Sequence, residues 1–246
     1  MKTGIQVSSL KPLLQTREQV REACSRMAAL GCRSVQLQWI DPAVPVSDIA
    51  GALEKSGLQS VSVQDFYQLV CERLEYYVNL NAATGGIWLT VSRIPERCKS
   101  LAGLDRFAAE LEKLQAYLDP FGQRVCLHPV SADFTAVPGL NAVEYLLEKL
   151  PRLELCLDLF HLDRNCTHMP TFIRRYAGRI PMVHFKDHRD GILVPAGSGE
   201  VNWTGVVRAC MDAGVEYGFV EQETWEGDPY VCLGSALTWL RGELEE

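Results

Sequence analysis

The sequence predicts an α/β fold, a single closed (β/α)8 barrel that spans residues 1–246 as one domain. Short runs with strand character occur eight times, and each is followed by a segment long enough for a helix. Parallel strands need such crossover segments, and eight of these units in about 250 residues favour a closed barrel over an open doubly wound sheet. The predicted strands are residues 4–8, 34–38, 58–63, 87–91, 124–128, 154–158, 180–186 and 216–221.

The segments between the strands carry helix start and stop signals. Thr16 followed by Gln19 is typical of a capping box, apolar residues then repeat with helical spacing, and Gly31 can end the helix in the left-handed conformation. Similar signals predict three further helices, which begin near Ser47, Asn141 and Asn202 and end before Gly57, Pro151 and Gly214.

Composition narrows the class of protein. With 47% hydrophobic residues and a net charge of −7, the chain is expected to be globular, and it lacks the basic footprint of nucleic-acid binding. The longest uncharged run, residues 76–92, contains asparagines and glycines and is too short to span a membrane. No secretory signal is evident at the N-terminus. Nine cysteines without a Cys-x-x-Cys pair predict free, mostly buried thiols in a reducing, cytoplasmic compartment, with Cys24, Cys126, Cys156 and Cys210 in apolar stretches.

Four neighbouring predicted strands carry a potential metal ligand at or near their carboxyl ends: His128, Asp158, His184 and Glu221. In a (β/α)8 barrel these ends meet at one mouth, where function resides. Two imidazoles and two carboxylates suit a divalent Mn, Fe, Co or Zn ion better than Mg, which prefers oxygen ligands. We therefore predict a divalent metal site at this mouth.

Several motifs in the second half of the chain resemble those of a known family. The stretches LDLFHLDRN (157–165), GRIPMVHFKD (178–187), GSGEVNW (197–203) and GFVEQE (218–223) resemble the xylose isomerase-like TIM barrels, the sugar phosphate isomerase/epimerase superfamily. The stretch ALGCRSVQLQW (29–39) resembles the second strand of that family with its preceding helix. The resemblance covers most of the chain and is strongest from about residue 124 onward.

The resemblance implies a set of site residues. The family usually binds metal through Glu, Asp, His and Glu on strands five to eight, which match His128, Asp158, His184 and Glu221 except at the first position. Histidine there is closer to the dehydratase-like branch, and it departs from a mechanism with two opposed glutamates. His161 resembles the second histidine of the family's D-x-x-H element, which lies near the substrate or a further metal.

Strand periodicity and loop composition add other candidates. Lys186 should share a face with His184, and Glu223 a face with Glu221, so that both reach the substrate. The guanidinium of Arg189 could bind a hydroxylated or anionic substrate. The loop Gly197–Gly199 follows the seventh strand, where barrels often bind phosphate through backbone N–H groups.

These residues predict a metal-dependent isomerase or epimerase of a polyol, ketose or keto acid. The metal would chelate a carbonyl and an adjacent hydroxyl and stabilise the enediolate. Glu221, with His128, would move the proton, and Lys186 or His161 would stabilise the oxygen.

Other functions stay open at this point. They are a metal-dependent dehydratase of the inosose dehydratase type, a Schiff-base enzyme that uses Lys186, and a degenerate sugar-binding barrel in which Gln36 and His128 replace glutamates. A DNA-repair role like that of endonuclease IV is disfavoured, because no histidine precedes residue 128. A homo-oligomer is neither predicted nor excluded.

Overall fold

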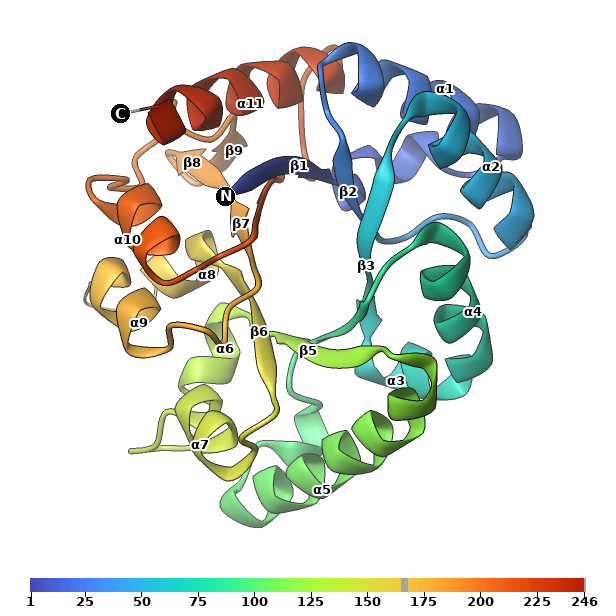
Figure 1. Cartoon of the computed structure of the whole chain (residues 1–246). Coiled ribbons are helices and arrows are strands. Elements are labelled where there is room, and N and C mark those ends of the chain that lie inside the picture. The colour runs from blue at the N-terminus through green and yellow to red at the C-terminus, as the bar shows by residue number, and fades with distance from the viewer. Residues whose placement is uncertain (165–167, 246) are drawn as a thin grey trace.

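In the computed structural model, which describes residues 1–164 and 168–245, eight parallel strands form a closed barrel. Figure 1 looks along the barrel, whose strands follow one another in chain order until the last strand, β10, pairs with the first, β1. The barrel strands are β1 (Lys2–Gln6), β2 (Ser34–Leu37), β3 (Gln59–Phe66), β4 (Trp88–Ser92), β5 (Arg124–His128), β6 (Glu154–Asp158), β7 (Met182–Phe185) and β10 (Tyr217–Val220). The predicted (β/α)8 barrel is therefore confirmed.

Helices surround the barrel, and the C-terminal helix α11 lies beside α1, so that both ends of the chain close the ring (Figure 1). The α-helices are α1 (Arg17–Ala29), α2 (Val46–Ser56), α3 (Tyr67–Glu72), α4 (Leu74–Thr84), α5 (Leu101–Leu118), α6 (Ser131–Phe134), α7 (Ala142–Lys149), α8 (Leu159–Asp163), α9 (Met169–Arg175), α10 (Val206–Asp212) and α11 (Pro229–Glu245). Short 3-10 helices are η1 (Val7–Leu13), η2 (Glu96–Cys98) and η3 (Asp119–Phe121), and β8 (Asp187–Arg189) pairs with β9 (Ile192–Val194) in an antiparallel hairpin.

Two of the four predicted helix caps are confirmed. Thr16 and Gln19 form the capping box of α1, and the side chain of Asn141 accepts hydrogen bonds at the start of α7. Ser47 was wrongly expected to cap α2, because that helix begins one residue earlier, after Pro45. The cap predicted at Asn202 is also wrong: its side chain accepts from the backbone N–H of Thr204, and α10 begins only after Gly205.

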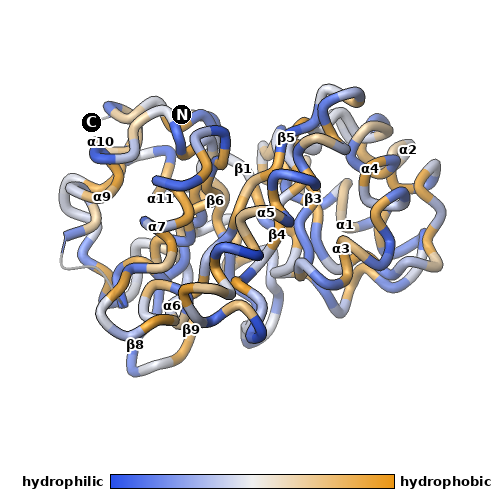
Figure 2. The backbone as a smooth tube through the Cα atoms, turned by 90° about the horizontal axis from the view of Figure 1, so that it is seen from below, coloured by the Kyte–Doolittle hydropathy of each residue, from blue (hydrophilic) through white to orange (hydrophobic). Residues whose placement is uncertain are grey.

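The barrel interior has an apolar layer and a polar layer. Below the mouth, a buried cluster fills the barrel and is distinct from the larger core between strands and helices; it comprises Val61, Trp88, Cys126, Cys156, Met182 and Phe219. Successive inward positions of one strand lie two residues apart, so Cys126 is followed by His128 and Met182 by His184 at the carboxyl end. Figure 2 shows the N-terminus and the β8–β9 hairpin at opposite ends of the barrel.

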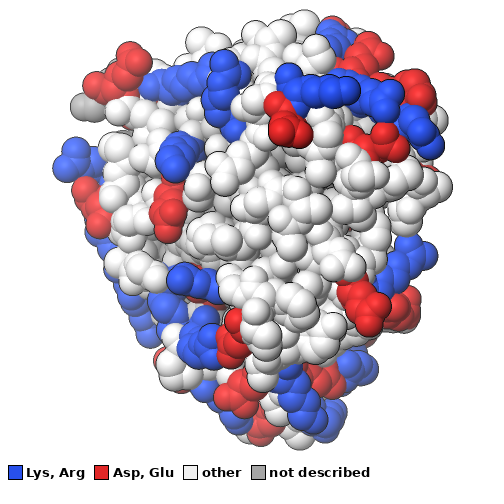
Figure 3. All heavy atoms as spheres, turned by 45° about the vertical axis from the view of Figure 1, so that its right-hand side comes forward, with Lys and Arg blue, Asp and Glu red and all other residues white. Residues whose placement is uncertain are grey.

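The surface charge and the buried cysteines agree with the expectations from the sequence. On the face in Figure 3, acidic and basic side chains are interspersed. Cys24, Cys126, Cys156 and Cys210 are buried free thiols, as predicted, whereas Cys166 lies outside the described residues. Within residues 1–164 and 168–245, none of the helices is long and apolar enough to cross a membrane.

Candidate active site

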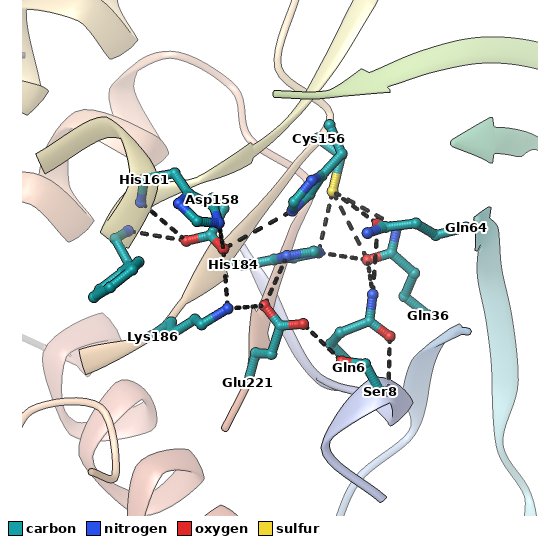
Figure 4. A network of polar contacts seen from close by, with 12 residues as sticks. Gln6, Ser8, Gln36, Gln64, Cys156, Asp158, His161, His184, Lys186 and Glu221 are labelled. Carbon is teal, nitrogen blue, oxygen red and sulfur yellow. Dashed lines mark hydrogen bonds and ion pairs between the residues drawn. The ribbon is translucent and has the colours of Figure 1, made fainter. Parts of the chain in front are cut away.

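The carboxyl ends of β5, β6, β7 and β10 bring the four predicted metal ligands together at the mouth (Figure 4). Side-chain donor atoms of His128, Asp158 and His184 all lie within 4.8 Å of one another. Glu221 joins them, with its Oε2 3.2 Å from Nδ1 of His184. All four residues are buried. The structure therefore contains a possible metal site of three residues, with a second carboxylate beside it.

Strand register and local capping position the two carboxylates. Asp158 pairs in register with His184 on the neighbouring strand. One oxygen of Asp158, Oδ1, accepts from the backbone N–H of Phe160 (2.9 Å) and caps α8, which leaves Oδ2 to face the site. Glu221 is held in a similar way, because the hydroxyl of Ser8 donates to its Oε1 (2.6 Å). Each carboxylate thus has one oxygen fixed by the fold and one directed to the other site residues.

The orientation of His184 is set from inside the barrel. Its Nε2 lies 2.5 Å from Oε1 of Gln36 and 3.1 Å from Sγ of Cys156. Figure 4 shows these two residues on one side of the imidazole ring and Glu221 on the other. Because an amide oxygen can only accept, Nε2 carries a proton. Burial opposes a charged ring, but Cys156 and Glu221 raise the pKa of His184, so that without a metal Nδ1 is protonated as well and faces Glu221.

The chemistry of these donors fits a divalent cation. Both ring nitrogens of His128 are buried yet lack a hydrogen-bond partner among the described residues, which is costly unless a ligand satisfies them, and Nδ1 of His184 faces only the carboxylate of Glu221. Burial, reinforced by the neighbouring His184, lowers the pKa of His128 to about 3, so the imidazole is neutral, as a metal ligand must be. Two imidazoles and two carboxylates match the predicted donor set, and a metal would replace the proton on Nδ1 of His184.

Lys186 lies among the acidic groups of the site. Its Nζ is 3.5 Å from Oδ2 of Asp158, 3.4 Å from Oε2 of Glu221 and 2.6 Å from Oε1 of Glu223. Burial disfavours its charge, but Glu221 and Asp158 reverse that effect and raise the pKa of the ammonium. Burial likewise opposes ionisation of Asp158 and Glu221, yet the charge of Lys186 lowers the pKa of both carboxyl groups. The site therefore holds a buried ammonium surrounded by carboxylates.

The structure also brings His161 and Glu223 to the mouth. Nε2 of His161 lies 3.7 Å from Oδ2 of Asp158, and its Nδ1 is hydrogen-bonded to the hydroxyl of Ser131 (2.9 Å). Burial and the nearby Glu221 raise the pKa of Glu223 to about 7. Both residues line the small cavity at the mouth, as do His128, Lys186 and Glu221.

Two predicted substrate contacts lie elsewhere. Arg189 is exposed on the β8–β9 hairpin, where its guanidinium donates to the carbonyl of Ser198, and it does not line the mouth cavity. The predicted phosphate loop is wrong: the backbone N–H groups of Gly197 and Gly199 both donate to the buried carboxylate of Asp187 (3.1 and 3.0 Å). These donors are occupied by the fold and cannot bind a phosphate.

Sequence reasoning missed the residues that support the site from within the barrel. They are Gln6, Ser8, Gln64 and Cys156, with Gln36 noted only as a replaced glutamate. The sequence does contain a signal for these residues. On β1 to β3, glutamine and serine occupy inward-facing positions, which lie two residues apart and where a barrel normally carries Val, Ile or Leu.

The comparisons with known proteins agree with this architecture. The model of one family, the xylose isomerase-like TIM barrel, matches residues 3–242. The chain belongs to this family. Similar solved structures include a sugar phosphate isomerase/epimerase from Parabacteroides distasonis, with a TM-score of 0.80 and 15% identity over 97% of this chain and 92% of the other.

Two further relatives of this xylose isomerase-like barrel are epimerases. A D-allulose 3-epimerase from Methylomonas sp. has a TM-score of 0.77 and 16% identity over 98% of this chain and 97% of the other. A 3-keto-D-glucoside 4-epimerase from E. coli has a TM-score of 0.74 and 17% identity over 98% of this chain and 99% of the other. At these identities the likeness establishes the shared fold. A search of curated protein sequences found no match.

Proposed function

We propose that this xylose isomerase-like barrel is a metal-dependent isomerase or epimerase of a sugar or a related hydroxy-carbonyl compound. The observation that carries the proposal is the pair of buried imidazoles, His128 and His184, whose ring nitrogens face Asp158 and Glu221 at the mouth. The names of the structural relatives, which include a D-allulose 3-epimerase, add support from the same fold.

His128, Asp158, His184 and Glu221 would hold the metal. When bound, a divalent cation would polarise the substrate carbonyl and an adjacent hydroxyl, which acidifies the α C–H bond. The contact with Gln36 orients the ring of His184, and the capping contact of Asp158 directs its second oxygen to this point, before any ligand arrives. Such preorganisation limits the cost of assembling the site.

The remaining steps use side chains of the mouth. The carboxylate of Glu221, oriented by Ser8, would accept the α proton. The ammonium of Lys186 would donate a hydrogen bond to the carbonyl oxygen as negative charge develops there, and His161 lies close enough to do the same. Return of the proton by Glu221 to the neighbouring carbon would give an isomer. An epimer would require a second group, such as Lys186 or His161, to protonate the opposite face of the same carbon.

Asp158 offers the sharpest test, because its two oxygens have separate roles. Asp158→Asn can keep the oxygen that caps α8 but loses the anionic oxygen of the site. We expect this variant to lose its bound metal, to stop exchanging the substrate α proton with deuterated water, and to remain folded. Asp158→Ala removes both roles and should also lose about 1 kcal/mol of stability from the missing cap.

Elemental analysis and deuterium incorporation, followed by NMR across a panel of ketoses, measure these effects. If Asp158→Asn and Glu221→Gln both retained the metal content and the turnover of the unmodified protein, the proposal would be wrong. A dehydratase is favoured by one observation, the histidine at position 128, which resembles that branch of the family. A product lighter by one water, detected by mass spectrometry, would establish that reaction instead.

A further inference from the structure

Two larger cavities adjoin a small inner cavity at the mouth. One, of about 340 Å³, shares Phe66, Ser92, Arg93 and Val130 with it, and the other, the outer cavity, lies on the side of Trp39. The inner cavity, beside His128 and Glu221, measures only about 50 Å³. The outer cavity, of about 300 Å³, shares Gln38, Trp39 and Gln64 with it and extends between the β2–α2 loop and the helices α3 and α4. Small-molecule sites usually measure about 300–1,000 Å³. The inner cavity alone therefore accommodates the reacting atoms but little else of a substrate.

Backbone strain is concentrated between and beside these cavities. Of the described residues other than glycine, three have a positive φ, and one of them, Asp190, lies in the tight turn between β8 and β9. The other two are Trp39 (58°) and Arg93 (66°), both at the mouth. Such a conformation costs about 1–3 kcal/mol and persists where the surrounding structure, often a ligand site, requires it.

The two strained residues belong to a row along the rim in which two adjacent aromatic rings lie between two cations. Nζ of Lys11 lies 4.7 Å from the ring centroid of Trp39, and the indole contacts the ring of Phe66. The guanidinium of Arg93 lies over the ring of Phe66, 5.1 Å from its centroid. The indole is thereby held where both cavities meet. Flat aromatic surface beside hydrogen-bonding groups is suited to a sugar ring, which has an apolar C–H face and polar edges.

The charges of the outer cavity favour an uncharged occupant. Lys11 and Arg73 line it, and neither has a carboxylate within ion-pair distance in the described part of the chain. Two acidic residues, Asp41 and Asp65, line the same space and balance their charge. Asp65 also accepts from the hydroxyl of Tyr77 (2.6 Å), so its carboxylate is fixed in place. A phosphate there would meet two carboxylates, whereas a polyhydroxylated ring could bind donors and acceptors of both kinds.

We infer that the substrate is a ketose carrying a second, uncharged sugar ring, which occupies the outer cavity beside Trp39, while the keto group lies in the inner cavity. This inference rests on the proposed function, because it places the reacting carbon beside Glu221. It makes Trp39, Arg73 and Tyr76, which line the outer cavity, determinants of substrate specificity.

Three ketoses that differ only at O6 provide the test: D-fructose, D-fructose 6-phosphate and isomaltulose, in which a glucosyl group replaces the hydrogen on O6. Their binding to the purified protein is measured by titration calorimetry. We expect isomaltulose to bind at least tenfold more tightly than either of the others. Tyr76→Ala should reduce the affinity ratio of isomaltulose to fructose about tenfold, and Trp39→Ala, as a second variant, should do the same. Tyr117→Ala, at an exposed tyrosine of α5, is the matched control and should leave the ratio unchanged.

Equal binding of isomaltulose and fructose, no binding of isomaltulose, or tightest binding of the phosphate would each overturn the inference. So would a ratio that Tyr76→Ala and Tyr117→Ala change equally. These outcomes are separate from failure of the proposed function, because metal content and its loss in Asp158→Asn are measured without any sugar. A protein that keeps its metal but prefers free fructose would retain the proposed function and refute the two-ring substrate.

Discussion

Replacing the buried lysine of the site tests whether its charge balances the carboxylates. In Lys186→Met the side chain keeps a similar length and loses the ammonium, which leaves Asp158, Glu221 and Glu223 without their common cation. Breaking a buried ion pair by removing one partner costs about 3–5 kcal/mol, because the remaining charge stays buried and unpaired. We expect a loss of that size when no divalent metal is present.

The expected loss can be measured as a melting temperature. For a chain of this size, 1 kcal/mol corresponds to about 2–4 °C, so Lys186→Met should unfold roughly 6–20 °C below the unmodified protein in EDTA. A divalent cation placed among the same carboxylates would replace the missing charge. Added Mn²⁺ should therefore stabilise the variant more than it stabilises the unmodified protein.

Lys149→Met is the matched control, because Lys149 also pairs with a carboxylate, that of Asp105, but both side chains are largely exposed. Exposed pairs contribute little, so this variant should melt close to the unmodified protein in either buffer. The reasoning about Lys186 would be refuted by equal melting temperatures of Lys186→Met and Lys149→Met in EDTA, or by a gap that Mn²⁺ leaves unchanged.

Two further predictions concern stability away from the site. Burial raises the pKa of the Asp133 carboxyl group to about 6, so the folded protein binds the carboxyl proton more tightly than the unfolded chain does. The stabilisation from this bound proton is full below about pH 4 and is lost as the pH rises through 6. Asp133→Asn should therefore melt above the unmodified protein at pH 8 and close to it at pH 4, and a constant difference would contradict this. A Cβ on Gly4 would lie 2.7 Å from ring carbons of Phe219, so Gly4→Ala should lower the free energy of unfolding by about 1–3 kcal/mol in urea titrations. Gly51→Ala, in open space on α2, should raise it by roughly 0.5–1 kcal/mol; equal effects of both changes would contradict the packing argument.

The fold was predictable because its signals are local and repeated. Each barrel strand is a short run bounded by turn or cap residues. The predicted boundaries differ from the observed ones by at most a few residues, and for β5 (124–128) they coincide. Capping was mispredicted at α2 and α10, whose N-cap residues, Pro45 and Gly205, make no side-chain cap hydrogen bond. Asn202 stabilises a turn of its own, and Gly205 then sets the true beginning of α10.

The candidate site was predictable where it depends on strand ends and obscure where it depends on contacts across the barrel. Asp158 and His184 are neighbours because adjacent parallel strands end together, which follows from the order of the strands. The contact between Gln36 and His184 joins β2 to β7 across the barrel, and the depth of each residue decides it. Arg189 lies on the hairpin after β7 and donates to the carbonyl of Ser198, a local contact that the order of the strands does not predict.

The contacts of Gln36 help to distinguish a functional site from one that has lost its activity through accumulated mutations. If Gln36 were the remnant of a lost glutamate, its amide would be expected to leave unsatisfied groups in the buried barrel. Instead Oε1 faces Nε2 of His184 and accepts from Gln6 (3.0 Å), while Nε2 of Gln36 donates to the hydroxyl of Ser62 (3.3 Å). A carboxylate could not donate to Ser62 and would add another buried negative charge to the barrel interior. An amide thus satisfies the neighbouring groups better than a carboxylate would, which favours a site adapted to its histidine at position 128 over a decayed one.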